Sequence, residues 1–458
     1  MSKQRVIAIF DVGKTNKKLF LFDEQYHILL EESKKLEETK DEDDFPCEDV
    51  AKLTDWVKES FNRIWSDERF DVKAVNFAAY GASFVYLDDK GAVILPLYNY
   101  LKPYPKKIQD QFYKTYGGES VVAQQTASPV LGNLNSGMQL YRLKYEKPEL
   151  FEKIKHALHL PQYLSYILTS GLSTDITSIG CHTQLWNFSE NNYHKWVKEE
   201  GMLEKFAPIL PCTKVAAHIH HTIEVGVGLH DSSAALIPYL FAFSEPFILL
   251  STGTWCISLN PFNQTPLSDY ELAHDGLCYL SYEGKPVKAS RLFAGYEHEQ
   301  QVKRLAEHFN KPMDYYTTVS ADATLLRKTK QNTQQLQKIE QGAMSGKSAF
   351  ANRDITDFKN YEEAYHQLIA DIMLQQVRST NLVLQGAPVK KIFVDGGFAN
   401  NAVYMKLLAV SFPELEIYAA TVPHASAMGA ALAIHKVWNL RPVPADLVKL
   451  KQYSALAV

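Results

Sequence analysis

The chain has 458 residues, a formal net charge of −4, 46% hydrophobic residues and 22% charged residues. A chain of this length is expected to form two or three domains rather than a single core. The composition is typical of a globular protein, and the slight acidic excess argues against a nucleic-acid partner, which usually requires a basic surface. No run of about 18 apolar residues is present, so no membrane partner is expected.

The cysteines and the start of the chain indicate a cytoplasmic location. The first residues lead directly into a strand-like run and do not have the shape of a signal peptide. The five cysteines are scattered and form no CxxC pair, which is typical of reduced thiols rather than a disulfide framework or a zinc site; they are Cys47, Cys181, Cys212, Cys256 and Cys278.

Two polar clusters are interpreted as structural. Residues 41–44 (DEDD) are expected to form a solvated loop. His218, His220 and His221 could suggest a metal site, but on a strand only His218 and His220 would share a face, and no carboxylate or cysteine lies close by in the sequence. Polar histidines at the edge of a sheet are therefore the favoured interpretation.

The first predicted elements form a β-hairpin. Residues 5–10 (RVIAIF) are an apolar run rich in β-forming residues, residues 11–17 (DVGKTNK) are polar and residues 18–22 are a second apolar run. Further along, the patterns predict strands at 72–79 and 84–87, a mostly helical stretch over 124–168 and connecting structure over 201–221.

A second unit of the same kind follows in the other half of the chain. Residues 246–250 (PFILL) and 255–259 are predicted strands, and residues 251–254 (STGT) form the loop between them. This echo of the first hairpin fits a protein built from two similar halves. We therefore expect two domains, residues 1–243 and 244–458.

The C-terminal half continues with helices and one further strand. An amphipathic helix is predicted because Tyr365, Leu368, Ile369 and Ile372 recur at helical spacing. The run that follows it predicts a strand at 391–394, a helix at 401–410 and a helix of small residues at 426–434 that could pack closely against a neighbour.

The first loop contains Gly13, Lys14 and Thr15, which resemble the end of a Walker A motif. That motif needs a glycine five positions earlier, where the chain has Ala8, and a helix after the threonine, where a returning strand is predicted. A phosphate-holding hairpin is the better interpretation.

In such a hairpin, Gly13 would permit the turn, and Lys14, Thr15 and Asn16 would offer a cation and hydrogen-bond donors to phosphate oxygens. Asp11, at the end of the first strand, could hold Mg²⁺ directly or through water. An ordinary Asp/Gly hairpin turn is the alternative.

The second loop repeats this chemistry with Gly253 and Thr254. A third turn, with Gly396 and Gly397, follows the strand at 391–394, and a flat adenine could lie against its bare backbone. Two loops facing each other would hold a triphosphate from both domains, which predicts ATP as the ligand.

His230 and Asp231 precede a run of small residues. An acid at this position could be only a helix N-cap. Phosphoryl transfer to a hydroxyl, however, needs a carboxylate that orients the attacking oxygen and accepts its proton. Asp231 is the candidate for that role.

Together, the ordered motifs DVGKTN, GLHDSSAA, STGTW and VDGGFANN resemble the signature series of the FGGY carbohydrate kinases, over almost the whole chain. The resemblance is greatest to the rhamnulokinase branch, with L-fuculose kinases nearby. Its longest supporting stretch is residues 134–178, which include the segment HALHLPQYLSYILT.

The resemblance implies an α/β fold of two actin-like (ribonuclease-H-like) domains with a cleft between them, the N-terminal domain for the sugar and the C-terminal domain for the nucleotide. It implies ATP and Mg²⁺ as cofactors and a small sugar as substrate, with a homodimer as a family-level expectation. The implied site residues are Asp231 as catalytic base; Asp11 for Mg²⁺; Gly13, Lys14, Thr15, Asn16, Gly253, Thr254, Gly396, Gly397 and Asn401 for ATP; and Tyr80, Gly81, His230 and Asp231 for the sugar.

The sequence departs from the family pattern in ways that bear on the sugar. Ser83 replaces a frequent acid, His424 replaces another, and the first loop has Lys14, Asn16 and Lys17 in place of the usual hydroxyl residues and arginine. The expected substrate is a deoxy-ketohexose such as L-rhamnulose or L-fuculose. Another pentulose or polyol is the alternative within the class, and a non-catalytic sugar or nucleotide sensor is the alternative outside it. Tyr80, Phe84, Tyr98 and Trp255 lie beside the motifs and could stack on a ligand.

Overall fold

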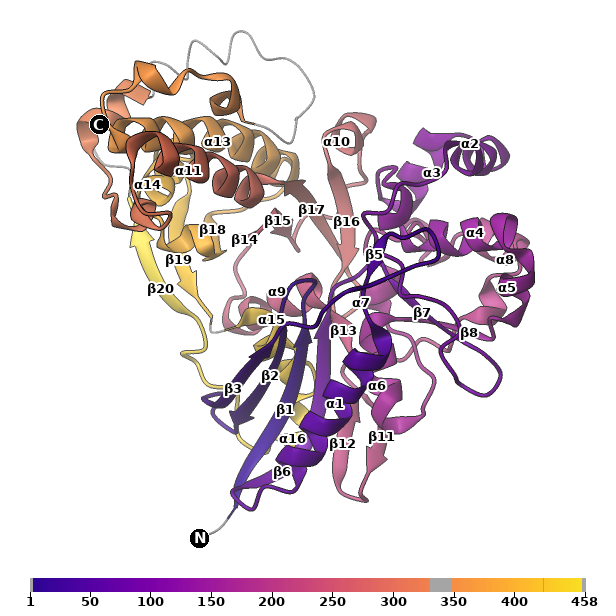
Figure 1. Ribbon diagram of the computed structural model, residues 1–458. Helices are drawn as coiled ribbons and strands as arrows, with labels where there is room; N and C mark the ends of the chain where they lie inside the picture. Colours follow the sequence, from indigo (N-terminus) through magenta and orange to yellow (C-terminus); the bar gives the residue numbers. More distant parts are fainter. Residues whose placement is uncertain (1–2, 330–347, 423, 455–458) are drawn as a thin grey trace. The chain divides into compact units, whose positions relative to one another are not determined.

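The computed structural model describes residues 3–329, 348–422 and 424–454 and divides into two compact units (Figure 1). The first unit comprises Met1–Ala242, Cys278–Pro286 and Pro423–Leu447, and the second comprises Phe243–Leu277, Val287–Val422 and Val448–Val458. Two later segments therefore return to the first unit after the chain has entered the second. Within the described residues, no helix has the length and apolar character needed to span a membrane.

The first unit is built on a sheet with the strand order β11-β12-β6-β1-β2-β3, in which β13 also pairs with β6. Strands β1, β2 and β3 are antiparallel neighbours, whereas β6, β12 and β13 continue the sheet in parallel with β1. The strands are Gln4–Val12 (β1), Lys17–Asp23 (β2), Ile28–Lys34 (β3), Phe70–Ala79 (β6), Val215–Ile219 (β11), Ile223–Gly226 (β12) and Leu229–His230 (β13).

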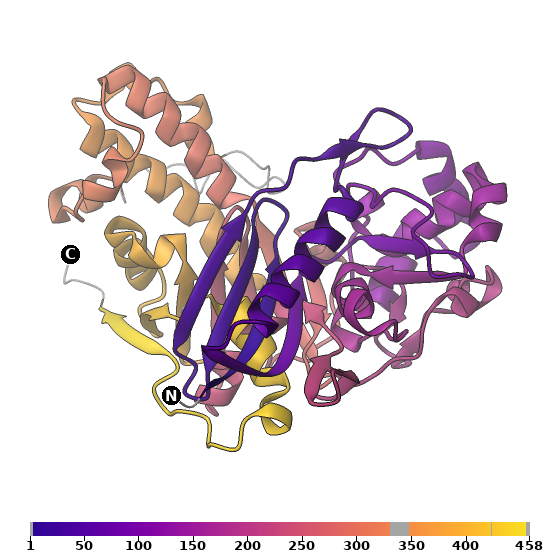
Figure 2. The same ribbon diagram turned by 60° about the horizontal axis from the view of Figure 1, so that its bottom comes forward.

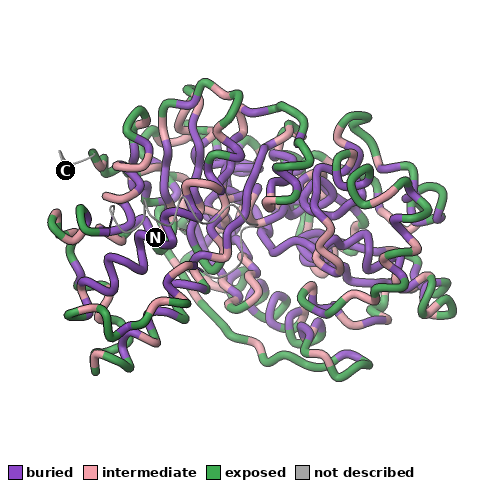
Figure 3. Tube along the Cα trace, turned by 90° about the horizontal axis from the view of Figure 1, so that it is seen from above, coloured by how far each residue is buried: buried purple, intermediate pink, exposed green. Residues whose placement is uncertain are grey.

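Helices cover both faces of this sheet, which explains why the middle of β1 is apolar without alternation. Phe10 packs with Trp56 of α1 on one face, where α6 also lies against the sheet, and α9 and α15 cover the other face (Figure 2). The central strands are buried along nearly their whole length, and the exposed residues gather in the connecting loops (Figure 3). The helices are Val50–Trp65 (α1), Leu160–Thr169 (α6), Asp231–Ala242 (α9), Ala425–Ala433 (α15) and His435–Trp438 (α16).

An additional helical subdomain follows β6 and has its own aromatic core, in which Phe112, Tyr141 and Trp196 are in contact. Its helices are Lys106–Thr115 (α2), Glu119–Thr126 (α3), Ser136–Glu146 (α4), Pro148–Lys153 (α5), Ile176–Ile179 (α7) and Lys195–Glu199 (α8). Its short strands are Phe84–Leu87 (β7), His156–His159 (β8), Trp186–Asn187 (β9) and Asn192–Tyr193 (β10). A separate two-stranded hairpin precedes α1 and consists of Thr39–Lys40 (β4) and Pro46–Cys47 (β5).

The second unit repeats the plan of the first. Its sheet has the order β16-β17-β15-β14-β18-β19-β20, in which β17, β15 and β14 are antiparallel neighbours and β18 and β19 continue in parallel with β14. The strands are Phe247–Thr252 (β14), Cys256–Asn260 (β15), Gly276–Leu280 (β16), Pro286–Leu292 (β17), Lys391–Gly396 (β18), Glu416–Thr421 (β19) and Lys449–Tyr453 (β20). Two such mixed sheets confirm the predicted α/β fold with two actin-like halves.

The second core is formed largely by α13, a long helix that begins where Asn360 caps the backbone N–H of Glu363. Residues Tyr365, Leu368 and Ile369 of this helix are fully buried. The helices of this unit are Asp269–Ala273 (α10), Ala294–Phe309 (α11), Tyr361–Leu384 (α13) and Ala402–Ser411 (α14), and a short 3₁₀ turn, Gly397–Asn400, follows β18.

The predicted strands and the three helices of the C-terminal half are confirmed within one or two residues at most boundaries, apart from the earlier start of α13. The stretch 124–168 is mostly helical, as expected, but it also contains β8, which pairs with β7. The stretch 201–221, expected to be connecting structure, contains β11, a half-exposed edge strand whose mixed burial gives no clear alternation.

The expectation that residues 41–44 form a solvated loop is confirmed for Glu42, Asp43 and Asp44, which are exposed, and is wrong for Asp41. Asp41 is buried, and both its carboxylate and that of Asp43 accept hydrogen bonds from Lys102. Burial acts to raise the pKa of Asp41, but the Lys102 ammonium and two backbone N–H groups outweigh it and hold this pKa below its usual range. These hydrogen bonds connect the β4–β5 hairpin to the loop that contains Lys102. The contact joins residues about 60 positions apart, so a local sequence pattern cannot predict it.

Candidate active site

Two carboxylates meet at one edge of the first unit's sheet. Strands β1 and β13 both run parallel to β6, so their carboxyl ends lie at the same edge. Asp11 is the penultimate residue of β1, and Asp231 directly follows β13 as the first residue of α9. Ligand sites in open α/β sheets form at this edge because the loops after parallel strands gather there.

Asp11 lies in a half-buried position, where its Oδ2 accepts a hydrogen bond of 2.7 Å from Ser426 Oγ in α15. Burial raises the pKa of Asp11 to about 6; the Ser426 hydrogen bond acts in the opposite direction, and the nearby Asp231 carboxylate adds to the rise. The two acids are thus close enough for the charge of one to affect the ionisation of the other.

Asp231 is held by the backbone of its own helix and lies next to the imidazole of His230. Its Oδ1 accepts a 2.6 Å hydrogen bond from the backbone N–H of Ser232 and lies 3.3 Å from His230 Nε2. Burial raises the pKa of Asp231 to about 6, and the bonds from Ser232 only partly offset it. Because about a third of its side chain remains exposed, the carboxylate is both perturbed and accessible to a ligand.

His230 is neutral at physiological pH, since burial lowers its pKa to about 4. The ring is therefore uncharged where its Nε2 lies 3.3 Å from Asp231 Oδ1, and its Nδ1 lies 3.4 Å from Ser233 Oγ. Gly81 permits the close approach of His230, the last residue of β13: a Cβ atom on Gly81 would lie 2.9 Å from His230 Cδ2. The structure thus brings the predicted residues Gly81, His230 and Asp231 together.

Three further aromatic residues near these groups carried no motif and were missed by the sequence analysis. The rings of His182 and Tyr279 lie near the His230 ring, with centroids 6.2 and 5.3 Å away. Tyr100 is close enough to Asp231 that the carboxylate adds to the rise of its pKa to about 12, which burial dominates. Each comes from a different stretch of chain, so only the fold could group them.

Three of the four side chains proposed to stack on a ligand pack within the protein. Phe84 is fully buried against the ring of His159, and the Tyr98 hydroxyl donates to Glu42. Tyr80 is buried, with its hydroxyl 3.4 Å from Glu48, so its polar end is occupied within the protein. Ser83 is also buried, and its Oγ has no hydrogen-bond partner among the described residues.

The first glycine turn connects β1 and β2 and is closed by a 3.0 Å hydrogen bond from Gly13 N–H to Asn16 O. Thr15 is exposed at its tip and Asn16 is half-buried. The Lys14 ammonium forms an ion pair of 2.7 Å with Glu38. The hairpin expected from the sequence is confirmed, and the side chains of Lys14, Thr15 and Asn16 are at least partly exposed to solvent.

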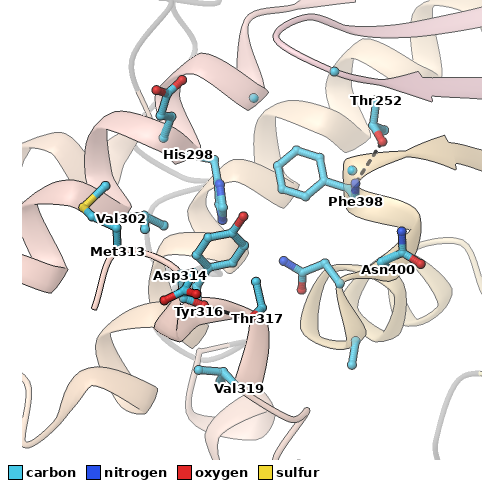
Figure 4. Close-up of a pocket in the computed structure, with 16 residues that line it drawn as sticks. Thr252, His298, Val302, Met313, Asp314, Tyr316, Thr317, Val319, Phe398 and Asn400 are labelled. Carbon is cyan, nitrogen blue, oxygen red and sulfur yellow. Dashed lines mark hydrogen bonds between the residues drawn. The ribbon is translucent and has the colours of Figure 1, made fainter. Parts of the chain in front are cut away.

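The second unit contains a cavity of about 800 Å³, a size within the usual range for small-molecule sites. It is lined by Gly253 of the turn between β14 and β15, by Gly397 and Phe398 after β18, and by Asn401 at the start of α14 (Figure 4). Three of the residues predicted to contact ATP therefore line one cavity, although they lie almost 150 positions apart.

Close backbone approaches shape the walls of this cavity. A Cβ atom on Gly396, which has a φ of +87°, would lie 1.9 Å from Thr252 O, and one on Gly295 would lie 1.8 Å from Gly253 O. Gly397 differs, because a Cβ atom there would meet nothing within 4 Å. Gly396 therefore shapes the turn without lining the cavity, and Gly397 presents its bare backbone to the cavity. Thr254 is not among the residues that line the cavity, and its backbone carbonyl accepts a hydrogen bond from the Tyr296 N–H.

A chain of hydrogen bonds through Tyr365 links two residues that line the cavity, Asn401 and His298. Asn401 caps α14 by accepting a bond from the Tyr404 N–H, and its Nδ2 donates to Tyr365 Oη at 2.7 Å. Tyr365 Oη also lies 2.9 Å from His298 Nε2, and burial lowers the pKa of His298 to about 4. His298 and Tyr316, which also lines the cavity, carried no recognisable motif in the sequence (Figure 4).

The donor set suits a loosely held magnesium ion better than a closed metal site. Within the described ranges, no three His, Cys, Asp or Glu side chains form a metal-binding group. Mg²⁺ usually binds through one or two carboxylates and keeps waters and substrate phosphates as its other ligands. Asp11, half-buried and near Asp231, fits that pattern.

The histidines on the β11–β12 hairpin need one correction. His218 does have a carboxylate partner, because Glu224 lies opposite it in the register and 2.9 Å from its Nδ1. His220 instead stacks on Trp65, with ring centroids 3.9 Å apart. A cross-strand partner six residues away in the chain is visible only once the hairpin register is known.

Comparisons with known proteins agree with this geometry. The chain is 24% identical over 277 residues to the rhamnulokinase of Mannheimia succiniciproducens, in an alignment that covers 57% of this chain and 55% of the relative. The chain thus spans only about half the length of that curated relative.

Two solved structures share the fold. A carbohydrate kinase from Novosphingobium aromaticivorans matches with a TM-score of 0.78 and 23% identity, covering 100% of this chain and 95% of the other. The ligand-bound xylulose kinase from Lactobacillus acidophilus matches with a TM-score of 0.81 and 16% identity, covering 99% and 94%.

Two family domains account for most of the chain. Residues 6–235 match the N-terminal domain of the FGGY family of carbohydrate kinases, and residues 244–442 match the C-terminal domain of the carbohydrate kinase FGGY group. With the duplicated actin-like sheets and the carboxylate pair already described, these matches mean that the chain belongs to the FGGY family of carbohydrate kinases.

Proposed function

We propose that this protein is an ATP-dependent kinase that phosphorylates a hydroxyl group of a small sugar, with Asp231 as the catalytic base. The observation that carries this proposal is that Asp231 and Asp11 lie near each other at the carboxyl edge of one sheet, both with a pKa raised to about 6. A carboxylate with this pKa is mostly ionised at neutral pH and is more basic than an ordinary aspartate.

In this mechanism the sugar binds to the first unit beside His230 and Asp231. Asp231 accepts the proton of the attacking hydroxyl, and the hydrogen bond from the Ser232 N–H holds the carboxylate in one orientation. Asp11 would hold Mg²⁺ directly or through water. Bound Mg²⁺ would supply positive charge that stabilises the transferring phosphoryl group.

The nucleotide base is assigned to the cavity of the second unit. A flat ring could lie against the open face of Gly397, and the Asn401 amide, oriented by Tyr365, could hydrogen-bond its edge. Gly253 and Thr254 would contact phosphates from the β14–β15 turn, and Gly13, Lys14, Thr15 and Asn16 would do so from the β1–β2 turn.

A deoxy-ketohexose such as L-rhamnulose or L-fuculose is the proposed substrate, supported by the partial similarity to rhamnulokinase. Another pentulose or a polyol is the alternative, because the chain departs from the branch pattern at Ser83 and His424. A cytoplasmic location and a homodimer are proposed only from the family resemblance.

The test is a panel of ketoses and polyols, each incubated with the protein, ATP and Mg²⁺ and assayed for ADP release and for the sugar phosphate. We expect at least one deoxy-ketohexose to raise ADP release well above the rate without sugar. Turnover with only a pentulose or polyol would correct the substrate, and no turnover above background with any sugar would favour a non-catalytic sensor.

Substitution of Gly397 by Ala is expected to weaken ATP binding without destabilising the protein. The added methyl group would meet no protein atom within 4 Å, so any effect on binding would come from contact with the ligand. We expect the Kd for ATP, measured by calorimetry, to rise about tenfold, since close overpacking typically costs 1–3 kcal/mol. An unchanged Kd would mean that the base does not lie against Gly397.

A further inference from the structure

Lys17 is a buried cation inside the turn that was predicted to bind phosphate. It is only 1% exposed, at the start of β2. Its Nζ donates to Gly13 O at 3.2 Å, to Lys14 O at 3.1 Å and to Glu48 Oε2 at 2.8 Å. An ammonium group has three hydrogens, so these three acceptors leave none for a ligand.

These contacts divide the turn into two sides. The carbonyl groups of Gly13 and Lys14 point toward the buried ammonium of Lys17. Among the described residues, none accepts a hydrogen bond from the backbone N–H of Lys14, Thr15 or Asn16. Successive free N–H groups in a tight turn form a concave site that favours anions. With two of its carbonyls held by Lys17, the turn leaves these N–H groups available for phosphate oxygens.

Glu48 fixes Lys17 from outside the turn. Its carboxylate is 3% exposed and its Oε2 also lies 3.4 Å from the Tyr80 hydroxyl. Glu48 immediately precedes Asp49, the N-cap of α1, and its backbone forms a bridge with Leu97. The partner of Lys17 thus belongs to a firmly packed part of the first unit rather than to a loop.

We infer that Lys17 is a positioning residue, which acts through the backbone of residues 13–16 to hold the turn in the form that binds the phosphates of ATP. Lys14, by contrast, is paired with the accessible Glu38 and remains available to a ligand. A buried ion pair adds little net stability compared with apolar residues of similar size. The role of this ion pair is therefore assigned to the conformation that it imposes on the turn. The inference rests on the proposed kinase function.

The test compares Lys17→Met with the double variant Lys17→Met/Glu48→Met. The single variant leaves Glu48 buried without its cation, and its thermal unfolding midpoint is expected to fall. The double variant removes both charges, and its midpoint is expected to recover most of that loss. ATP affinity is expected to fall about 10- to 100-fold in both variants. This is the loss expected when one backbone N–H of the turn no longer donates to a charged phosphate oxygen.

Two comparisons separate positioning from general damage. Adenosine has no phosphate groups, so its affinity is expected to stay within about twofold in the double variant. Lys102→Met breaks another buried ion pair of the same unit, with Asp41 and Asp43, and should lower the unfolding midpoint without changing the affinity for ATP.

A double variant that is stable and binds ATP as the wild type does would overturn the inference, as would equal losses of ATP and adenosine binding. A wild-type protein that binds neither ligand would instead overturn the proposed function.

Discussion

Asp231→Asn is expected to lower kcat for sugar phosphorylation about 10²- to 10⁴-fold, the range that a positioned general base contributes. The amide keeps the size of the side chain and can still accept the hydrogen bond from the Ser232 N–H, but it cannot take up the proton of the hydroxyl. Kd for ATP should stay close to the wild-type value, because Asp231 belongs to the sugar end of the proposed site.

The measurement pairs steady-state kinetics on the best sugar of the panel with calorimetric titration of ATP. Near-wild-type turnover in Asp231→Asn would rule out the base assignment. Loss of both turnover and ATP binding would instead point to a role for Asp231 in nucleotide binding or in the fold.

If Asp231 is the catalytic base, kcat/KM is expected to fall at low pH. The base acts only when ionised, and burial raises the pKa of Asp231 to about 6. The value of kcat/KM should therefore be highest above about pH 6 and fall about tenfold for each pH unit below it. The pKa of Asp11 is also about 6, and the two acids interact. The midpoint of the pH profile therefore describes the ionisation of both carboxylates together rather than that of Asp231 alone. A profile that is flat down to pH 4 would contradict the assignment.

Gly429→Ala is expected to destabilise the first unit and to reduce activity at the same time. Gly429 lies in α15 against α9, and a Cβ atom there would be 1.8 Å from the backbone oxygen of Ala234. Neither helix backbone can move freely, so the cost should be about 1–3 kcal/mol or more. Because α9 begins with Asp231 and α15 carries the Ser426 that binds Asp11, a shift between them should also displace both carboxylates.

A lower unfolding midpoint with a lower kcat in Gly429→Ala would support this packing. The matched control is Gly397→Ala, the same substitution where the methyl group meets open space, and its midpoint should be unchanged. Wild-type stability and activity in Gly429→Ala would show that α9 and α15 do not pack this closely.

Local patterns were sufficient for the elements that carry the site. The apolar runs on either side of Gly13 and Gly253 predicted two hairpins because β-forming residues flank short polar turns. The small-residue pattern at 426–434 predicted close helix packing, and Gly429 confirms it. The order of the motifs was sufficient to predict the family and to select Asp11 and Asp231 as candidate site residues.

Other features depend on contacts between distant residues. The segment 423–447 belongs to the first unit, so the helix that supports Asp11 comes from more than 400 positions later in the chain. His182, Tyr279, His298 and Tyr316 surround the candidate sites without any motif of their own.

From the sequence alone, the chain could be recognised as two strand–turn–strand halves with a carboxylate at the end of the first strand and another at the start of a helix. These features depend on residues close in the chain, where hydrophobic periodicity and turn propensity act. Only the tertiary structure decided that Lys17 points inward to Glu48, that Tyr80 faces the interior and that Asn401 is held by Tyr365. The direction of a side chain and its burial, and hence its pKa, depend on packing against residues that no local pattern contains.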